Sequence, residues 1–248
     1  NGGKYLGEFF VYIEENNTDY CFLSLPKMES RNVPKDKFDT GINDKIIEPV
    51  ETLPKNIYKI SCDISKSDEV INMYKKIKKK FGRLDLVVNA STEEIYPKKF
   101  ENLVWKDFDV QIKSQLKGNF NIVNESVKIM QDYGGKIIVI NSAATDLPMQ
   151  DFYHYTSSKG ALTSFIKSIA GELANKGIQI NSVSPSMIDN RQMEKVSSRA
   201  KMITIAKTPI KRLCLPEDVA NAVVYLASNK ASFLCGETIR INGGQIII

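Results

Sequence analysis

The second half of the chain contains three side chains, those of Ser142, Tyr155 and Lys159, whose types and spacing suit proton transfer to a carbonyl oxygen. Tyr155 and Lys159 are four residues apart, and residues at that spacing lie one turn apart on the same face of a helix. An ammonium beside a phenol favours the phenolate, so we expect the pKa of Tyr155 to fall below its reference value of about 10. Tyr155 could then donate and accept a proton near neutral pH.

The segments around these residues predict how they are positioned. Apolar residues recur at helical spacing after Lys159, at Ala161, Leu162, Phe165, Ile169 and Leu173. The apolar run 136–140 predicts a buried strand, and Ser142 follows it closely. Ligands bind at the carboxyl ends of the strands in open α/β sheets, so the Ser142 hydroxyl is expected at a ligand-binding edge.

A tyrosine and a lysine at helical spacing also occur by chance, so the pair alone identifies no enzyme. Here a serine stands thirteen residues before the tyrosine, and this combination resembles the short-chain dehydrogenase/reductase family. The similarity is greatest to the subgroup of comparable length that includes the 3-oxoacyl-carrier-protein reductases, and it is strongest from Phe81 to Gly244. The resemblance implies an α/β fold with a Rossmann-type, doubly wound parallel sheet flanked by helices, in one domain over residues 1–248.

The resemblance also implies an activity and a role for each residue. The chain is expected to be an NAD(P)-dependent oxidoreductase that interconverts a ketone and a secondary alcohol by hydride transfer. Tyr155 would protonate the carbonyl oxygen, Ser142 would polarise it, and Lys159 would lower the tyrosine pKa and bind the nicotinamide ribose. An asparagine of the family's proton relay falls on Gln115, which keeps the amide but adds one methylene.

Cofactor-binding positions follow from the same resemblance, and they fall on Gly2, Gly7, Lys27, Asp63, Asn89, Tyr155, Lys159, Pro185 and Ile188. The first fifteen residues predict a turn that runs into a helix, with glycines near the cofactor pyrophosphate. No carboxylate follows the predicted strand 20–25, so NADP(H) is mildly favoured over NAD(H). For Asp63 a helix N-cap is an alternative role.

Two further segments carry expectations about the fold. The strand that precedes the phosphate-binding turn in the family is missing from the sequence, so we expect it upstream of Asn1 and its place in the sheet to be empty here. Residues 186–208 follow the predicted strand 177–183 and are helix-prone, which suits either a substrate lid or a pair of surface helices. His154 adjoins Tyr155 but points about 100° away from it along the helix, so we expect a surface or lid contact.

Composition excludes several function classes. The net charge is +5, and the lysines in Lys75–Lys80 lack interleaved aromatic residues, which favours a solvated helix face over a nucleic-acid site. One histidine and no ligand cluster argue against a metal site. No apolar run is long enough to span a membrane, and four scattered cysteines indicate free thiols in the cytoplasm. The apolar tail Ile246–Ile248 suggests a subunit contact in a homodimer or homotetramer.

Two rival hypotheses remain open at this stage. The first is a protein that keeps the fold but has lost turnover, because several cofactor positions depart from the family pattern: Asn1, Tyr5, Ala90, Thr92, Gln115 and Ser186. The intact Ser142, Tyr155 and Lys159 argue against it. The second is a sugar-nucleotide epimerase or dehydratase with the same Tyr-x-x-x-Lys motif, which is disfavoured because those relatives usually have a larger C-terminal substrate domain.

Overall fold

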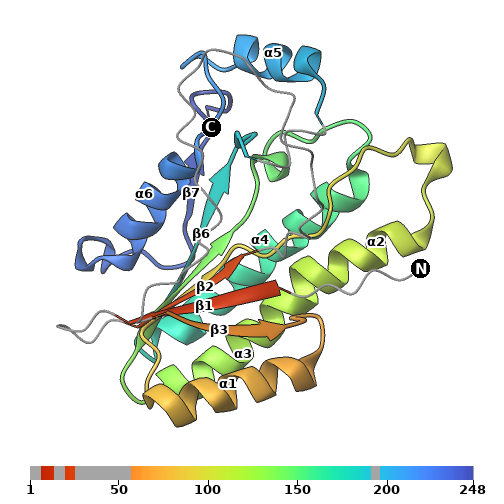
Figure 1. Ribbon diagram of the computed structural model, residues 1–248. Coiled ribbons are helices and arrows are strands. Elements are labelled where there is room, and N and C mark those ends of the chain that lie inside the picture. Colours follow the sequence, from red (N-terminus) through yellow and green to blue (C-terminus); the bar gives the residue numbers. More distant parts are fainter. Residues whose placement is uncertain (1–6, 14–19, 26–56, 191–195, 248) are drawn as a thin grey trace, which may run out of the picture.

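A computed structural model describes residues 7–13, 20–25, 57–190 and 196–247, with side chains from Ile60 onward. A sheet of seven strands forms its centre, in the order β3-β1-β2-β4-β5-β6-β7 (Figure 1). The strands are β1 (Gly7–Ile13), β2 (Tyr20–Leu25), β3 (Ile57–Cys62), β4 (Leu86–Asn89), β5 (Gly135–Ile140), β6 (Ile178–Pro185) and β7 (Thr238–Ile241).

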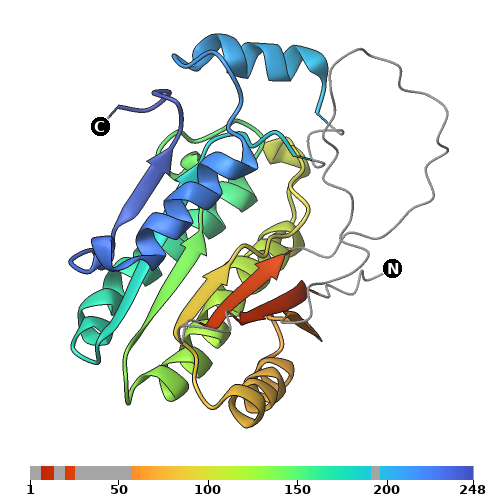
Figure 2. The same ribbon diagram turned by 60° about the vertical axis from the view of Figure 1, so that its left-hand side comes forward.

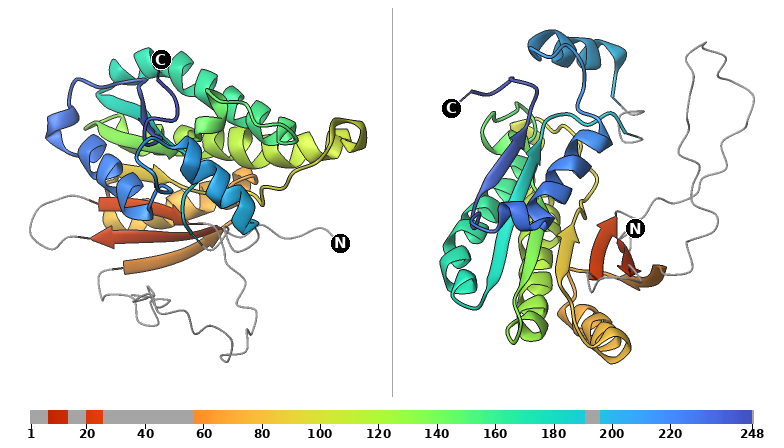
Figure 3. Two further views of the ribbon diagram at one scale, coloured as in Figure 1. Left: turned by 90° about the horizontal axis from the view of Figure 1, so that it is seen from above. Right: turned by 90° about the vertical axis from the view of Figure 1, so that its left-hand side faces the viewer.

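Helices cover both faces of this sheet. They are α1 (Ser67–Phe81), α2 (Trp105–Ile112), α3 (Gly118–Met130), α4 (Tyr153–Ala174), α5 (Ser198–Lys207) and α6 (Pro216–Ala227). Short turns are η1 (Phe100–Asn102), η3 (Ala143–Thr145) and η5 (Asn229–Ala231), and η2 (Lys113–Lys117) is a π-helical turn. Helices α1, α3 and α4 lie on one face and α6 on the other, while α5 lies beyond the carboxyl end of β6 (Figures 2 and 3).

Strand direction confirms the predicted α/β class and adds one reversed strand. Neighbouring strands from β2 through β4, β5 and β6 to β7 pair in parallel. Strand β1 pairs antiparallel with both of its neighbours, β2 and β3. Parallel strands buried on both faces read as continuous apolar runs, which is why β4, β5 and β6 were recognisable from the sequence.

Alternating side chains of the strands fill two apolar cores. Val87, Ile137 and Val139 pack with residues of α1, α3 and α4 in one cluster. Val88 and Ile138 belong to a second cluster with residues of α6. Because successive strand residues point to opposite faces, the same strands hold both helical layers in place.

The amino-terminal prediction was wrong in two respects. Residues Gly7–Ile13 form strand β1, whereas a helix was expected after the turn. Strand β2 occupies the position beside β4 that the resemblance reserved for an upstream strand, so that place in the sheet is filled. The sequence of β1, GEFFVYI, is rich in aromatic and β-branched residues, which favour strands when a partner strand is available on each side.

The long helix predicted for residues 105–130 is present, but it is not regular throughout. Helix α2 continues through the π-helical turn η2 into α3. Gln115, which stands where the resemblance placed the family's relay asparagine, lies inside η2. Single π turns inside α-helices often occur at functional sites, and η2 packs against α4.

The lysine segment and the described cysteines have the states that the composition predicts. The five lysines of the segment 75–80 are exposed on α1, and Cys62, Cys214 and Cys235 carry free thiols. Within the described ranges, no helix combines the length and the apolar character that crossing a bilayer would need. The same residues contain no group of three or more His, Cys, Asp or Glu side chains that could hold a metal ion.

Candidate active site

The structure brings Ser142, Tyr155 and Lys159 together at the carboxyl end of β5. Tyr155 lies in the first turn of α4, and Lys159 lies one turn further on. The Ser142 side chain lies near enough to the Tyr155 hydroxyl to lower the pKa of that phenol. The Lys159 Nζ atom lies 6.0 Å from the centre of the Tyr155 ring. The geometry expected from the sequence spacing is therefore present.

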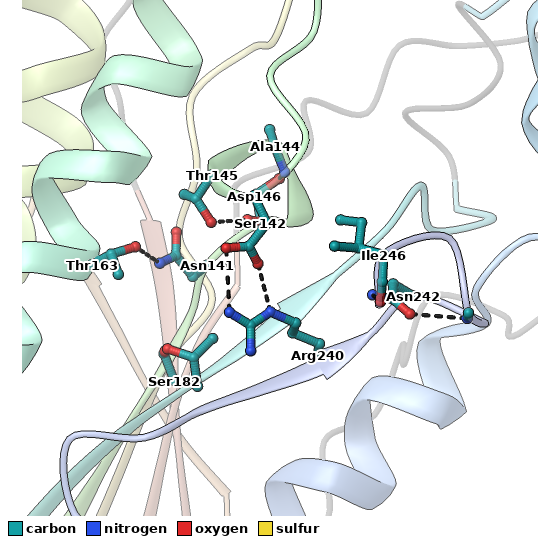
Figure 4. A network of polar contacts seen from close by, with 12 residues as sticks. Asn141, Ser142, Ala144, Thr145, Asp146, Thr163, Ser182, Arg240, Asn242 and Ile246 are labelled. Atoms are coloured by element: carbon teal, nitrogen blue, oxygen red, sulfur yellow. Dashed lines mark hydrogen bonds and ion pairs between the residues drawn. The ribbon is translucent and has the colours of Figure 1, made fainter. Parts of the chain in front are cut away.

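Ser142 is held in place by the turn that it begins. It has an extended backbone at the start of η3, and its Oγ accepts a hydrogen bond of 3.2 Å from the Ala144 N–H. The next residue after β5, Asn141, donates from Nδ2 to Thr163 Oγ1 on α4 at 2.7 Å (Figure 4). The segment that carries Ser142 is thus tied to the helix that carries Tyr155.

Burial dominates the electrostatics of Tyr155 and Lys159. Their exposed fractions are 6% and 2%. Burial raises the pKa of Tyr155 above its usual value, and the Ser142 side chain acts in the opposite direction. Burial lowers the pKa of Lys159 to about 7, because the charged amine loses its hydration and gains no carboxylate partner among the described residues.

These directions correct one expectation. Lys159 was predicted to lower the pKa of Tyr155 through its charge, but in this structure only the Ser142 side chain lowers it. With a pKa of about 7, the amine is not a permanent cation near neutral pH. Its Nζ donates to the backbone oxygen of Ile140 at 2.9 Å. An amine carries several donors, so Lys159 has donor capacity left for a ligand hydroxyl.

Gln115 is near this site but is bonded elsewhere. Its side chain is fully buried, and its Nε2 donates to Thr92 Oγ1 at 3.2 Å. Its Oε1 has no hydrogen-bond partner among the described residues. Asn119, which the sequence analysis missed, donates from Nδ2 to the Gln115 carbonyl oxygen at 2.6 Å. Asn119 is one helical turn after Gln115, and that spacing was the available signal.

Asn89, predicted as a cofactor-binding position, is bonded within the protein at the end of β4. Asn89 is 2% exposed at the end of β4, and its Nδ2 donates to Asn119 Oδ1 at 2.8 Å. Its Oδ1 accepts from the backbone and the hydroxyl of Ser91. These bonds connect the carboxyl end of β4 to η2 through Asn119.

Some of the remaining predicted cofactor positions lie near the site, and others lie elsewhere or outside the described residues. Pro185 ends β6, and Ile188 makes a bridge to Cys214 just beyond it. Gly7 lies in β1, not in a phosphate-binding turn, which corrects that expectation. Gly2 and Lys27 lie outside the described residues. Residues Ser142, Tyr155, Lys159 and Pro185 therefore gather at one edge of the sheet, where the nicotinamide half of a dinucleotide would fit.

Asp63 does not cap helix α1. Its Oδ1 accepts hydrogen bonds from the Ser65 backbone at 3.0 Å and from the Ser65 hydroxyl at 2.7 Å. The residue before α1 is Lys66, and no side chain caps it. The N-cap alternative was therefore wrong, and Asp63 instead closes the turn between β3 and α1.

His154 is buried, which overturns the predicted surface or lid contact. It is fully enclosed, with its ring 5.0 Å from the ring of Tyr96 and 6.4 Å from that of Phe108. Neither ring nitrogen has a hydrogen-bond partner among the described residues. Burial lowers the pKa of His154, so the neutral ring is favoured.

A fold with a serine, tyrosine and lysine at the carboxyl edge of a doubly wound sheet defines a class of oxidoreductase, and the chain's relatives agree. The family described as enoyl-(acyl carrier protein) reductase matches residues 38–245. The chain belongs to the short-chain dehydrogenase/reductase family, whose members interconvert ketones and secondary alcohols with a nicotinamide cofactor.

Three relatives show how similar this chain is to individual proteins. The 3-oxoacyl-(acyl-carrier-protein) reductase of Rickettsia felis is 32% identical over 213 residues, covering 84% of this chain and 86% of the relative. The corresponding reductase of Thermotoga maritima is 28% identical over 207 residues, covering 82% and 83%. A solved 7α-hydroxysteroid dehydrogenase, in complex with NADH and 7-oxo glycochenodeoxycholic acid, superposes with a TM-score of 0.70 at 28% identity, covering 74% of this chain and 72% of that one.

Proposed function

We propose that this chain transfers a proton to a ketone oxygen from Tyr155 while NADPH or NADH supplies the hydride. Ser142 hydrogen-bonds the same oxygen and stabilises the negative charge that develops on it. Lys159 uses its remaining donors to hold the nicotinamide ribose hydroxyls. The observation that carries the proposal is that η3, which Ser142 begins, packs against α4, where Tyr155 and Lys159 lie buried one helical turn apart.

The substrate is inferred from the relatives. One group acts on a 3-oxoacyl unit, and another solved relative holds a 7-oxo bile acid. Both molecules present a ketone, which is the group that Tyr155 and Ser142 would address. The loss of a carboxylate after β2 and the presence of Lys27 in the sequence support NADP(H) as the preferred cofactor.

Gln115 is proposed to take part in the proton relay through its side-chain oxygen. That Oε1 is buried and lacks a partner among the described residues, and a buried acceptor of this kind favours a bound water. Changing Gln115 to Asn tests the role, because it restores the family's residue while shortening the side chain. We expect an altered rate with an unchanged fold, measured by turnover and circular dichroism.

The proposal also covers the lid, the assembly and the location of the chain. Helix α5 contains no buried residue and follows the site-lining strand β6, which supports a substrate lid within residues 186–208 of a single domain 1–248. Ile247 is 90% exposed, which supports a subunit contact through the apolar tail in a homodimer or homotetramer. The free thiols of the described cysteines support a cytoplasmic location.

The direct test replaces Tyr155 with Phe. Removing the acid–base hydroxyl should lower turnover by roughly 10³-fold, with an unchanged circular dichroism spectrum and NADPH affinity. Tyr153→Phe is the matched control, because Tyr153 is on the same helix and its ring contacts Phe100 at 5.8 Å, outside the site. Wild-type turnover in Tyr155→Phe would refute the mechanism, and failure to bind NADPH or NADH by fluorescence titration would favour a protein that has lost its enzymatic function.

A further inference from the structure

We propose that Arg240 and Asp146 form a positioning pair that fixes the turn carrying Ser142. The proposal rests on the role of Ser142 in the proposed function. It concerns two residues that touch neither the reacting atoms nor Tyr155, and that act through the backbone of η3.

The turn is a compact unit whose own bonds do not fix its direction. Ser142 begins η3 and Asp146 ends it. The Thr145 hydroxyl donates to the Ser142 carbonyl oxygen at 2.9 Å, and the Asp146 N–H donates to the Ala143 carbonyl oxygen at 3.1 Å. Because all of these bonds lie within five residues, they give the turn its shape but leave its orientation to contacts from other elements.

Arg240 supplies such a contact from the edge strand β7. Its Nε donates to one oxygen of Asp146 at 2.7 Å, and its Nη2 donates to the other at 3.3 Å (Figure 4). A guanidinium that meets both oxygens of a carboxylate restricts direction as well as distance. Arg240 lies on β7, 94 residues away in sequence, so the bond joins the end of η3 to the edge of the sheet.

The register of the strands shows that this connection crosses β6. Arg240 is paired with Ser184, and Ile140 at the end of β5 is paired with Val183. Asn141, one residue beyond Ile140, continues β5 with an N–H bond to the Val183 carbonyl oxygen at 2.7 Å. Arg240 thus spans from β7 over β6 to the turn that follows β5.

Ser142 is consequently held from two directions. On one side, Asn141 binds Thr163 of α4, the helix that carries Tyr155. On the other side, Asp146 binds Arg240 of β7. Losing the second attachment would let η3 move relative to α4, and the Ser142 hydroxyl would lose its alignment with Tyr155.

The exposure of the pair separates this role from a purely structural one. The side chains of Arg240 and Asp146 are 38% and 19% exposed, and ion pairs of that kind contribute little to stability. A change at Asp146 should therefore affect the alignment of Ser142 far more than the melting temperature.

The chain contains a matched control pair. Arg83 also meets both oxygens of a carboxylate, that of Asp85, and these side chains are 41% and 18% exposed. The pair precedes β4, at the opposite end of the sheet from Ser142. Asp85→Asn and Asp146→Asn therefore remove the same charge from similar environments, and only the second change lies beside the site.

The experiment compares both variants in alcohol oxidation with NADP⁺ across a range of pH. Asp146→Asn should lower kcat roughly tenfold, since small misplacements of catalytic groups have effects of this order. The midpoint of the kcat–pH profile of this variant should lie at a higher pH than in the wild type. The reason is that the effect of Ser142, which lowers the pKa of Tyr155, is weakened. Asp85→Asn should match the wild type in both respects. The exchanged pair Asp146→Arg with Arg240→Asp should recover part of the loss.

Ser142→Ala in the same assay separates the two proposals. If Ser142→Ala is strongly impaired while Asp146→Asn behaves like Asp85→Asn, the positioning role is wrong and the proposed function stands. If Ser142→Ala has wild-type activity, the proposed function itself fails. A kcat loss in Asp146→Asn that comes with a lower melting temperature and an unchanged pH midpoint would also overturn the positioning role.

Discussion

This fold stabilises the charged form of one buried group, Asp107, and destabilises that of another, Lys159, on a neighbouring helix. Asp107 on α2 accepts hydrogen bonds from Lys98 Nζ at 2.7 Å, the Val104 N–H at 2.9 Å and the Tyr96 hydroxyl at 3.0 Å. Lys159 on α4 is more deeply buried, and among the described residues its side-chain amine donates one hydrogen bond, to a backbone oxygen. The charged form is satisfied at Asp107 and is left without an opposite charge at Lys159.

The pKa values follow this difference. The hydrogen bond from Lys98, with that from Val104, lowers the pKa of Asp107 to about 2, so its charged form is stabilised. Burial lowers the pKa of Lys159 to about 7, so its charged form is destabilised. Groups whose pKa is strongly perturbed by burial are enriched at functional sites. From this contrast we expect a structural role for Asp107 and a functional one for Lys159.

The largest effect is expected from Lys159→Met, which removes a buried amine whose charge is destabilised by burial. Turnover should fall by about 10²- to 10³-fold, the range seen when a group of the proton-transfer machinery is lost. The free energy of unfolding at pH 7 should rise by roughly 2 kcal/mol, because apolar replacements of buried charges are often stabilising. Turnover and urea denaturation measure the two quantities.

The pH dependence of stability sharpens the same test. The unfolded lysine keeps its proton up to a pKa of 10.5, whereas the folded one loses it near 7. The unfolded state therefore binds more protons between these values, and wild-type stability should rise with pH across that window. Lys159→Met should lack this rise. A variant that is inactive and also less stable than the wild type would show that Lys159 is a structural residue.

Asp107→Asn should have the reverse outcome, with a loss of stability and little change in turnover. Weakening the bonds to Lys98 and Val104 should reduce the free energy of unfolding by about 2 kcal/mol, the usual value for hydrogen bonds to a charged group. Asp109→Asn is the control on the same helix, since Asp109 forms a more exposed pair with Lys113.

Acid titration gives a second readout for Asp107. Its folded pKa of about 2 is below the usual 3.8, so its contribution to stability is present above about pH 4 and is lost as the pH falls towards 2. That loss should be smaller in Asp107→Asn than in the wild type, measured by denaturation at several pH values. An identical acid profile in both proteins would contradict the structural role.

A smaller effect is expected at His154, which lies in the first turn of α4. Burial lowers its pKa, with Asp107 opposing and Lys98 assisting that change. The unfolded histidine takes up a proton below its usual pKa of 6.5 while the folded one resists, so the histidine makes the fold less stable as the pH falls. His154→Phe should reduce the loss of melting temperature between pH 7.5 and pH 5. An equal loss in both proteins would show that His154 is not a source of acid sensitivity.

How far the sequence predicted this molecule depends on how local the interactions are. Strands β4, β5 and β6 and helix α4 were predicted because long apolar runs and a helical repeat carry their own signal. The proximity of Tyr155 and Lys159 follows from helical spacing alone. The position of Ser142 was predicted from where the preceding strand ends. The structure confirms that Ser142 lies just beyond the end of β5.

The errors share a dependence on distant parts of the chain. His154 is buried because Tyr96 and Phe108 cover it, and no local pattern indicates those neighbours. The fall in the pKa of Tyr155 was inferred from one charge, whereas burial by the whole fold sets the direction. Residues Gly7–Ile13 form a strand because β2 and β3 pair with them on either side. The same is true of the Arg240–Asp146 pair, which joins segments 94 residues apart.

The central claim is that Ser142 and Tyr155 act as one proton-transfer unit, and the pH dependence of kcat/KM for alcohol oxidation tests it most directly. This quantity reports the ionisation of the free enzyme, in which the Ser142 side chain lowers the pKa of Tyr155. Ser142→Ala should reduce kcat/KM by about 10²-fold and move its midpoint to higher pH. A Ser142→Ala profile that coincides with the wild type in height and midpoint would contradict the account.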